Sequence, residues 1–400
     1  MAQTGINIQV ANTQLGSTPR VNANSMLIVV GAKAGSGGTM PLELSKPYMI
    51  TSPTGLTALG VTQANNPELY KQVNDFYNPT SAINNNGTML WIVGVPDSSA
   101  GNSIKKTLVP WLRETVANGF EYRPRNIMIS LAPAETDITP SDVQTAINSA
   151  YTEGFSVVCV FDGQQFVTKN LAENGSTSMK DLSEQDAMMV GVVIVTDVAG
   201  GRPIVGRIGG YMSQLSVGTS IGDTSLARFD TSLFLVDPEG SAFPANTPCG
   251  TLALDTINEL GSKQYIFART RPPRNGLWFN DGATCAEATT ALSTLEAART
   301  IASMVDDLRD FFTPYINSKV PVNAAGDIDP TYKQVVIDNA TATVINPYIE
   351  SGDISDARIS LVAQNNDMVG TRTWEVTLQI LAAPTLRWVD AFVFYVSSLT

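Results

Sequence analysis

Short apolar runs alternate with amphipathic helical patterns along the first two thirds of this chain, and that alternation most constrains its fold. The runs are rich in β-branched residues, as strands buried on both faces are, and the clearest occupy residues 25–31, 89–96, 126–133, 156–163 and 188–197. Helical patterns follow most of these runs, at residues 102–117, 140–153 and 203–217. Strands that alternate with helices favour a mostly parallel, helix-covered sheet. The sequence therefore predicts an α/β domain over residues 21–280.

A long helical pattern follows this domain, at residues 283–312. Its apolar residues recur at steps of three and four, on one stripe of a helix: Leu292, Leu295, Ala298, Ala302, Val305, Leu308 and Phe312. Pro314 ends the pattern because proline disfavours helix in the residue before it. A helix of this length would extend about 45 Å, so we expect it to span its domain or to dock on another molecule.

A smaller α+β unit follows, and we assign residues 281–385 to it together with the long helix. The sequence predicts a second helix over residues 332–350 and strands over residues 358–363 and 373–382. A last strand belongs to a C-terminal segment, residues 386–400, whose apolar side chains include Val389, Phe392, Phe394 and Val396. An apolar strand at a chain end must find a partner edge or become an aggregation site.

The first twenty residues form a separate N-terminal segment. Ile6, Ile8 and Val10 alternate with polar residues and so share one face of an extended strand. Two interpretations stay open: an edge strand of the first domain, or an extended arm that pairs with another subunit. A second polar segment, residues 169–182, is predicted to project from the sheet as a surface loop.

Composition excludes several classes of protein. The 400 residues carry a net charge of −12, which argues against a nucleic-acid-binding protein, because such a protein needs a basic surface. No histidine is present, and this removes every catalytic triad that depends on one. No apolar run is long enough to cross a membrane, and the first residues do not resemble a secretory signal.

The remaining candidates for chemistry are weak. Cys159, Cys249 and Cys285 lie too far apart for a typical zinc site or disulfide framework. The glycine-rich loop at residues 32–38 matches neither the phosphate-loop nor the dinucleotide-binding spacing. Asp306 and Asp307 are adjacent on a helix, so their side chains diverge and cannot share a proton. We therefore predict no catalytic residue, no cofactor and no metal site.

Basic residues cluster in one short segment. Arg269, Arg271 and Arg274 lie within six residues, and no phosphate loop accompanies them. We interpret them as partners for acidic side chains, either within the chain or across an interface.

Several segments in a fixed order carry a family resemblance. A strand reading YIFART precedes Gly276, Phe279 and Asp281, a helix with Arg299 follows, and then the turn PYINSKVPVN. The early segments LSKPYMITS and LWIVGVP, and the closing helix and strands, fit the same order. In this order the chain resembles the contractile tail-sheath proteins of bacteriophages and related injection machines, in a compact variant.

The resemblance implies a structural subunit. Such subunits stack in rings of six into a helical tube around an inner tail tube, and contraction drives that tube through a target cell envelope. The implied partners are further copies of the chain, the tail-tube protein, and baseplate and tail terminator proteins, with no nucleic acid and no membrane insertion. The implied location is the virion tail, assembled in the bacterial host cytoplasm.

The resemblance also suggests interface residues. Terminal strands are shared between neighbouring subunits in this family, which implies intersubunit pairing for the two apolar segments at the chain ends. Acidic residues of the long helix fall largely outside its apolar stripe, and we expect them to face the tail tube: Glu296, Asp306, Asp307 and Asp310.

Two alternatives remain. One is an enzyme with a doubly wound sheet that binds a small ligand at the strand ends, where Asp162, Asp197 and Asp237 follow predicted strands. The other is a different phage structural protein from the tail or baseplate.

Overall fold

A seven-stranded sheet forms the centre of the molecule, and all of its neighbouring pairs are parallel except the pair at one edge, β2 with β3. In spatial order its strands are β2 (Pro47–Ile50), β3 (Leu90–Pro96), β1 (Met26–Ala32), β4 (Asn126–Ser130), β5 (Val158–Asp162), β6 (Val190–Val193) and β9 (Tyr265–Ile266). The computed structural model describes residues 25–383, except 81–82, 97–99, 119–121, 132–137, 165–178, 199, 226–227, 230–231, 237–246 and 273. Every side chain of β1, β4 and β5 is buried, as the apolar runs predicted.

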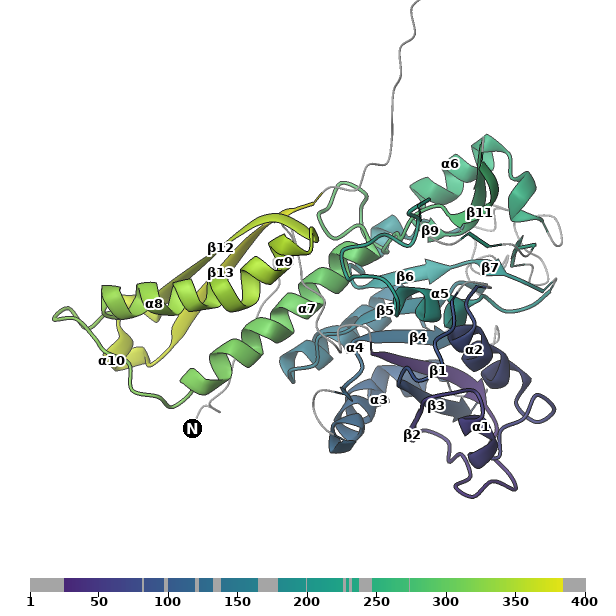
Figure 1. Ribbon diagram of the computed structural model, residues 1–400, viewed down its shortest axis with the longest axis horizontal. Coiled ribbons are helices and arrows are strands. Elements are labelled where there is room, and N and C mark those ends of the chain that lie inside the picture. The colour runs from purple at the N-terminus through teal and green to yellow at the C-terminus, as the bar shows by residue number, and fades with distance from the viewer. Residues whose placement is uncertain are drawn as a thin grey trace, which may run out of the picture.

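Helices cover this sheet (Figure 1). The helices of this part of the chain are α1 (Gly55–Ala58), α2 (Pro67–Tyr77), α3 (Ala100–Thr115), α4 (Pro140–Thr152), α5 (Val205–Met212) and α6 (Leu254–Ser262). Helix α2 packs on α5 and on β1, whereas α3 packs on α4 and on β3. The crossovers that contain α2 and α3 run in opposite directions along the sheet, so right-handed connections place these helices on opposite faces.

Helices α2 and α5 approach each other closely because two glycines of α5 face the backbone of α2. A Cβ atom added at Gly206 would lie 2.1 Å from the carbonyl oxygen of Gln72, and one at Gly210 would lie 2.1 Å from that of Phe76. Only glycine permits this spacing at either position.

Three small antiparallel pairs complete the strands among the described residues. They are β7 (Val195–Thr196) with β8 (Phe234–Leu235), β10 (Ala268–Arg271) with β11 (Arg274–Phe279), and β12 (Ile354–Ala363) with β13 (Trp374–Ala382). The β12–β13 hairpin packs against a nearly continuous run of helix: α8 (Pro330–Ala340), a π-helical turn (Thr341–Ile345) and α9 (Asn346–Glu350). The turn α10 (Met368–Thr371) lies in the hairpin loop. We call α8 to β13 the C-terminal unit.

The central helix α7 (Leu295–Phe312) lies between the sheet and the C-terminal unit (Figure 1). It is shorter than predicted. Thr294 is the N-cap, so the helix begins only at Leu295. The Thr294 hydroxyl accepts a hydrogen bond from the amide of Ala297 at 3.3 Å. The preceding residues fold as a compact loop, in which Thr284 donates to the carbonyl oxygen of Leu292 at 2.6 Å. The end of the helix at Phe312 agrees with the prediction.

The predicted fold class, a mostly parallel helix-covered sheet with a smaller α+β part, is confirmed. The predicted terminal strands, in residues 1–20 and 386–400, lie outside the described residues, as do residues 169–178 of the predicted surface loop. The described end of that loop is anchored rather than projecting. Met179 and Leu182 are buried, and Lys263 Nζ donates to the carbonyl oxygen of Met179 at 2.8 Å.

Two further observations bear on the sequence analysis. The cysteines Cys159, Cys249 and Cys285 are all buried and unpaired. Among the described helices, none has the length and apolar character to span a bilayer.

Candidate functional site: the central helix, the strand ends and the open hairpin

Asp306 of α7 is fully buried and is surrounded by three arginines. Its Oδ2 lies 2.9 Å from Arg123 Nη2 and 3.2 Å from Arg125 Nε, and its Oδ1 lies 3.2 Å from Arg309 Nη1. Arg123 and Arg125 come from the segment just before β4, so these ion pairs attach α7 to the sheet. A buried carboxylate is tolerated only where such partners replace its hydration.

Two arginines of α7 bind the carboxyl ends of neighbouring helices. Arg309 donates to the carbonyl oxygens of Tyr151 and Gly154, at the end of α4, at 3.2 Å and 3.1 Å. Arg299 donates to that of Met212, the last residue of α5, at 3.0 Å. Burial lowers the pKa of Arg299 to about 10, which leaves it charged at neutral pH. Cations satisfy the free carbonyl groups at helix ends, so α7 fixes α4 and α5 in place.

Polar contacts also join the C-terminal unit to the rest of the chain. Tyr348 Oη donates to Asp307 Oδ2 of α7 at 2.9 Å, and both groups are buried. Asp353 Oδ1 accepts from Ser216 Oγ at 2.9 Å and from the amide of Gly218 at 3.1 Å. These contacts fix the C-terminal unit against α7 and against the loop after α5.

The burial of α7 corrects the prediction that its acidic residues face a tail tube. The side chains of Glu296, Asp306 and Asp307 are 7%, 0% and 2% exposed, so they are not available to another molecule. The prediction assumed that residues off the apolar stripe face solvent, whereas Arg123 and Arg125 cover Asp306 and Tyr348 of the C-terminal unit covers Asp307. Asp310, in the last turn, is exposed, and for it the expectation stays a prediction.

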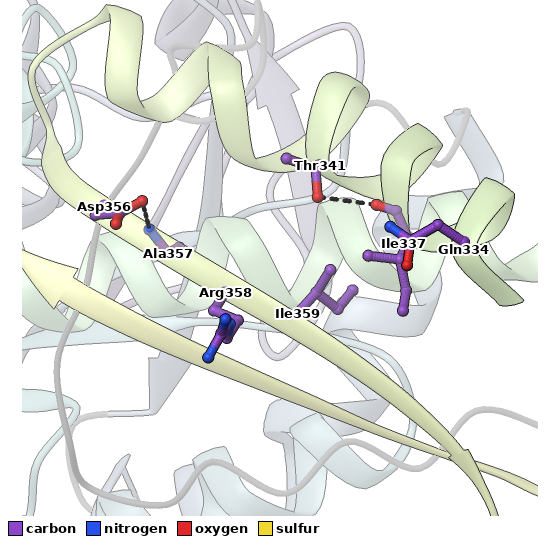
Figure 2. Close-up of a pocket in the computed structure, with 7 residues that line it drawn as sticks. All are labelled: Gln334, Ile337, Thr341, Asp356, Ala357, Arg358 and Ile359. Carbon is purple, nitrogen blue, oxygen red and sulfur yellow. Dashed lines mark hydrogen bonds between the residues drawn. The ribbon is translucent and has the colours of Figure 1, made fainter.

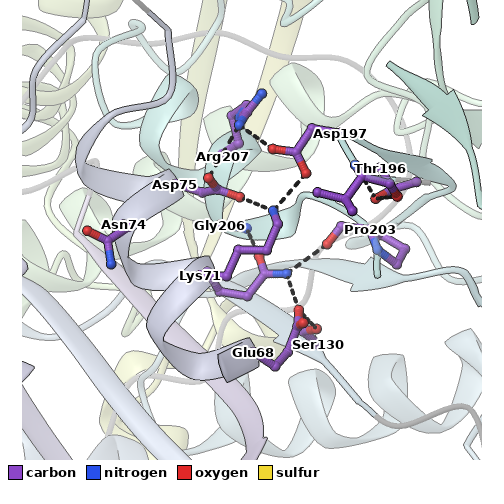
Figure 3. Close-up of polar contacts among 12 residues, drawn as sticks. Glu68, Lys71, Asn74, Asp75, Ser130, Thr196, Asp197, Pro203, Gly206 and Arg207 are labelled. Carbon is purple, nitrogen blue, oxygen red and sulfur yellow. Dashed lines mark hydrogen bonds and ion pairs between the residues drawn. The ribbon is translucent and has the colours of Figure 1, made fainter. Parts of the chain in front are cut away.

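Two of the three carboxylates after the strands, Asp162 and Asp197, take part in contacts within the chain, and Figure 3 shows those of Asp197. Asp162 is buried, and its Oδ2 lies 3.3 Å from Ser130 Oγ, which also lies 3.4 Å from Glu68 Oε1. Burial raises the pKa of Asp162 to about 8, and the charge of Glu68 adds to that rise. Asp237 lies outside the described residues.

Asp197 belongs to a second group of charges at this end of the sheet. It lies 2.9 Å from Lys71 Nζ and 2.5 Å from Arg207 Nη2, and both cations also contact Asp75. Burial alone would raise the pKa of Asp197, but Lys71 and Arg207 outweigh that effect and hold the pKa below its usual value. The group ties α2 and α5 to the end of β7.

Side chains of α2 and its cap occupy the place where a doubly wound sheet binds ligands. That place is the crevice at the carboxyl ends of β1 and β4, where the strand order reverses. Asn66 bonds to both the amide and the carbonyl of Lys33, at 2.7 Å and 3.1 Å. Gln72 bonds to the carbonyl of Pro203 at 2.8 Å and to the amide of Gly206 at 2.7 Å. In the described part of the chain, no group of three or more acidic or cysteine side chains could hold a metal ion.

No described strand pairs with the outer edges of the hairpin in the C-terminal unit. Within the described residues β12 pairs with β13 alone and β13 with β12 alone. A groove of about 580 Å³ lies between α8 and β12 (Figure 2), lined by Gln334, Ile337, Thr341, Asp356, Ala357, Arg358 and Ile359. An open strand edge beside a groove offers free backbone groups together with room for side chains.

Solved structures resemble this chain over its whole length. A sheath complex of the extracellular contractile injection system PVC, in its contracted state, has a TM-score of 0.63 at 12% identity and covers 99% of this chain and 98% of its own. The helical sheath of the anti-feeding prophage, also contracted, has a TM-score of 0.62 at 11% identity and covers 98% and 99%. The baseplate of the same prophage has a TM-score of 0.61 at 10% identity and covers 99% of both chains. At these identities the likeness establishes a shared fold.

Sequence comparison gives a family and no characterised relative. No curated protein matches the chain. The model of the DUF2586 N-terminal domain matches residues 3–283, which comprise the whole sheet and end before α7. The chain therefore belongs to the DUF2586 family.

Proposed function

We propose that this protein is a structural subunit of a contractile tail sheath. It polymerises into a helical tube around an inner tail tube and contracts to drive that tube through a target cell envelope. The observation that carries the proposal is the full-length likeness to contractile sheath structures, which includes α7 and the C-terminal unit beyond the family match at residue 283. A fold shared only through the α/β sheet would be weaker support, because such sheets serve many functions.

Pairing between terminal strands and the open hairpin supplies a mechanism of assembly. The strands predicted around Ile6–Val10 and residues 388–396 would add, in neighbouring copies, to the edges of β12 and β13 that no described strand occupies. Burial of Ile6, Ile8 or Val10 would each contribute about 1.5–3 kcal/mol, less the free-energy cost of ordering the arm. Pairing within the same chain is the alternative, and the deletion experiment below distinguishes the two.

The proposed partners follow from this role. They are further copies in rings of six, the inner tail-tube protein, and baseplate and tail terminator proteins, and the proposed location is the virion tail after assembly in the host cytoplasm. Asp310 is the remaining tube-facing candidate of the four acidic residues considered. The net charge of −12 disfavours nucleic acid as a partner, and we propose no membrane insertion.

A structural role fits the strand ends better than catalysis does. The crevice expected of a doubly wound enzyme holds Asn66 and Gln72, whose amide groups already bond to the chain's own backbone. An enzyme would need that space for its ligand. Tight binding of a small molecule measured by calorimetry, and lost on mutation of Asp162 or Asp197, would support the enzyme instead.

Electron microscopy of the purified protein tests the proposal. Tubes with an axial repeat are expected, whereas discrete rings would favour a baseplate component. Deletion of residues 1–12 should leave a folded, soluble subunit that forms no tubes. Normal tubes from the deleted protein would contradict the arm mechanism without contradicting the sheath role.

A further inference from the structure

Three arginines on the β10–β11 hairpin stand out because no carboxylate of the described residues forms an ion pair with them. They are Arg269, Arg271 and Arg274, which lie within six residues, and Arg271 pairs with Arg274 across the strands. We call them the basic hairpin. Since like charges directly opposite each other destabilise a strand pair, this arrangement costs the isolated subunit stability.

Contacts within the subunit compensate only part of the positive charge of these arginines. Arg271 donates to the carbonyl oxygen of Asn280 at 2.7 Å, and Arg274 to that of Thr224 at 2.6 Å. Burial lowers the pKa of Arg271 and the neighbouring charge of Arg269 lowers it further, while the nearby carboxylate of Asp281 opposes part of this shift. The Nε atom of Arg269 is buried and has no hydrogen-bond partner. A carboxylate from outside the subunit would offset this concentration of positive charge.

Acidic residues lie at the same end of the molecule, on α6. The short turn Cys249–Thr251 that leads into α6 contacts β10, and Figure 1 shows α6 and β11 together beyond β9. Asp255 and Glu259 are exposed and lie four residues apart, on one side of the helix. Leu254, beside Asp255, is 67% exposed, the highest value among the large apolar side chains described. Glu259 has a partner in Lys263, at 3.1 Å, whereas no described cation pairs with Asp255.

We propose that the basic hairpin of one subunit docks on the exposed face of α6 in a second copy of this chain, with Asp255 and Glu259 as the carboxylates and Leu254 as an apolar contact. Two different surfaces at one end of the molecule form a heterologous contact, and copies related by rotation then close into a ring or rise into a helix. Two chains of net charge −12 repel each other at long range. A local contact of opposite charge therefore also determines how the two subunits are positioned relative to each other. This inference rests on the proposed polymer and adds the lateral contact within it.

Charge reversal on each side tests the contact. The double variant R269E/R274E should raise the protein concentration needed for tube formation by about tenfold or more, since like charges would then face each other. The double variant D255K/E259K should do the same. Arg271 is left intact because it anchors Asn280. The control K33E/K319E changes the net charge as much as R269E/R274E, at two exposed lysines outside both surfaces, and should assemble as the wild type does.

Mixing the two double variants is the decisive step. In an alternating mixture every contact again joins opposite charges, so the mixture should form tubes at concentrations where neither variant does alone. Thermal unfolding of each variant checks that it is folded. If R269E/R274E does not fold, R269Q/R274Q replaces it and its own loss of assembly is the test, because a neutral hairpin cannot restore a contact of opposite charges in the mixture. Assembly of R269E/R274E at the wild-type concentration, or a mixture that fails to recover, would overturn the inference. Failure of the wild type to form tubes would instead contradict the proposed sheath role.

Discussion

Asp306 shows how one buried charge holds several segments together. Its carboxylate faces Arg123, Arg125 and Arg309, so removal of its charge would leave three guanidinium groups with little compensation in a buried place. Loss of one partner of a buried ion pair typically costs about 3–5 kcal/mol.

We expect D306N to lower the free energy of unfolding by about 3 kcal/mol or more, measured by urea denaturation. D255N, on α6, is the control. Asp255 is exposed, so its substitution should change stability by less than about 0.5 kcal/mol. Equal effects of the two substitutions would contradict the assigned role of Asp306.

Asp162 should make the stability of the fold depend on pH. Burial raises its folded-state pKa to about 8 from an ordinary value of 3.8, so the folded form retains the proton where the unfolded form releases it. The contribution of Asp162 is therefore fully present below pH 3.8 and is lost as pH rises toward about 8. Glu68 opposes ionisation of Asp162, whereas Arg202 favours it.

D162N should remove that dependence, because an amide resembles the neutral acid and does not ionise. At pH 8 we expect D162N to be more stable than the wild type by at least about 1 kcal/mol, and at pH 4 the two should be nearly equal. Urea denaturation at both values measures this, with D255N as an exposed control whose pH dependence should match the wild type. A difference that is the same at both pH values would contradict the assignment.

At the scale of elements, the α2–α5 contact depends on two glycines. A Cβ atom at Gly206 or Gly210 would lie 2.1 Å from a carbonyl oxygen of α2, so either helix would have to move. Gly261, near the end of α6, has no atom within 4 Å of its added Cβ.

G210A should therefore lower the free energy of unfolding by about 1–3 kcal/mol, whereas G261A should leave it unchanged or raise it by up to about 1 kcal/mol. Both are glycines within helices, so the comparison separates close packing from helix propensity. Thermal melts of the two variants measure the difference, and a harmless G210A would show that α2 and α5 are not locked in this spacing.

The elements differ in how far the sequence predicts them. β1, β4 and β5 are predictable, because a strand buried on both faces must be an uninterrupted apolar run. The length of α7 is not predictable, since the N-cap Thr294 lies inside a longer helical sequence pattern. Its burial is not predictable either, because periodicity identifies one apolar stripe and gives no sign of a second packed side. Arg123 and Arg125, which flank Pro124 beside a buried strand, could have indicated that a carboxylate is buried nearby. They are the partners of Asp306.

At the scale of the whole molecule, the C-terminal unit is joined to α7 by a buried polar contact and to the loop after α5 by a partly buried one. Truncation after Leu386 removes the predicted apolar C-terminal strand but none of these contacts. If that strand serves a neighbour, the truncated protein should unfold at the wild-type temperature, remain soluble and form no tubes. Calorimetry and microscopy measure these outcomes. Aggregation with a lowered unfolding temperature would indicate instead that the strand completes the subunit's own sheet.

The outer edges of the β12–β13 hairpin, which no described strand occupies, have a consequence for the ends of a polymer. If each copy receives strands at its hairpin and gives strands to others, donors and acceptors balance throughout the interior. At one terminus of the tube the last copies then keep vacant edges, and at the other they keep unused strands. The polymer is therefore directional, and proteins that bind its two termini must be complementary in opposite senses: one inserts a strand and the other presents an edge.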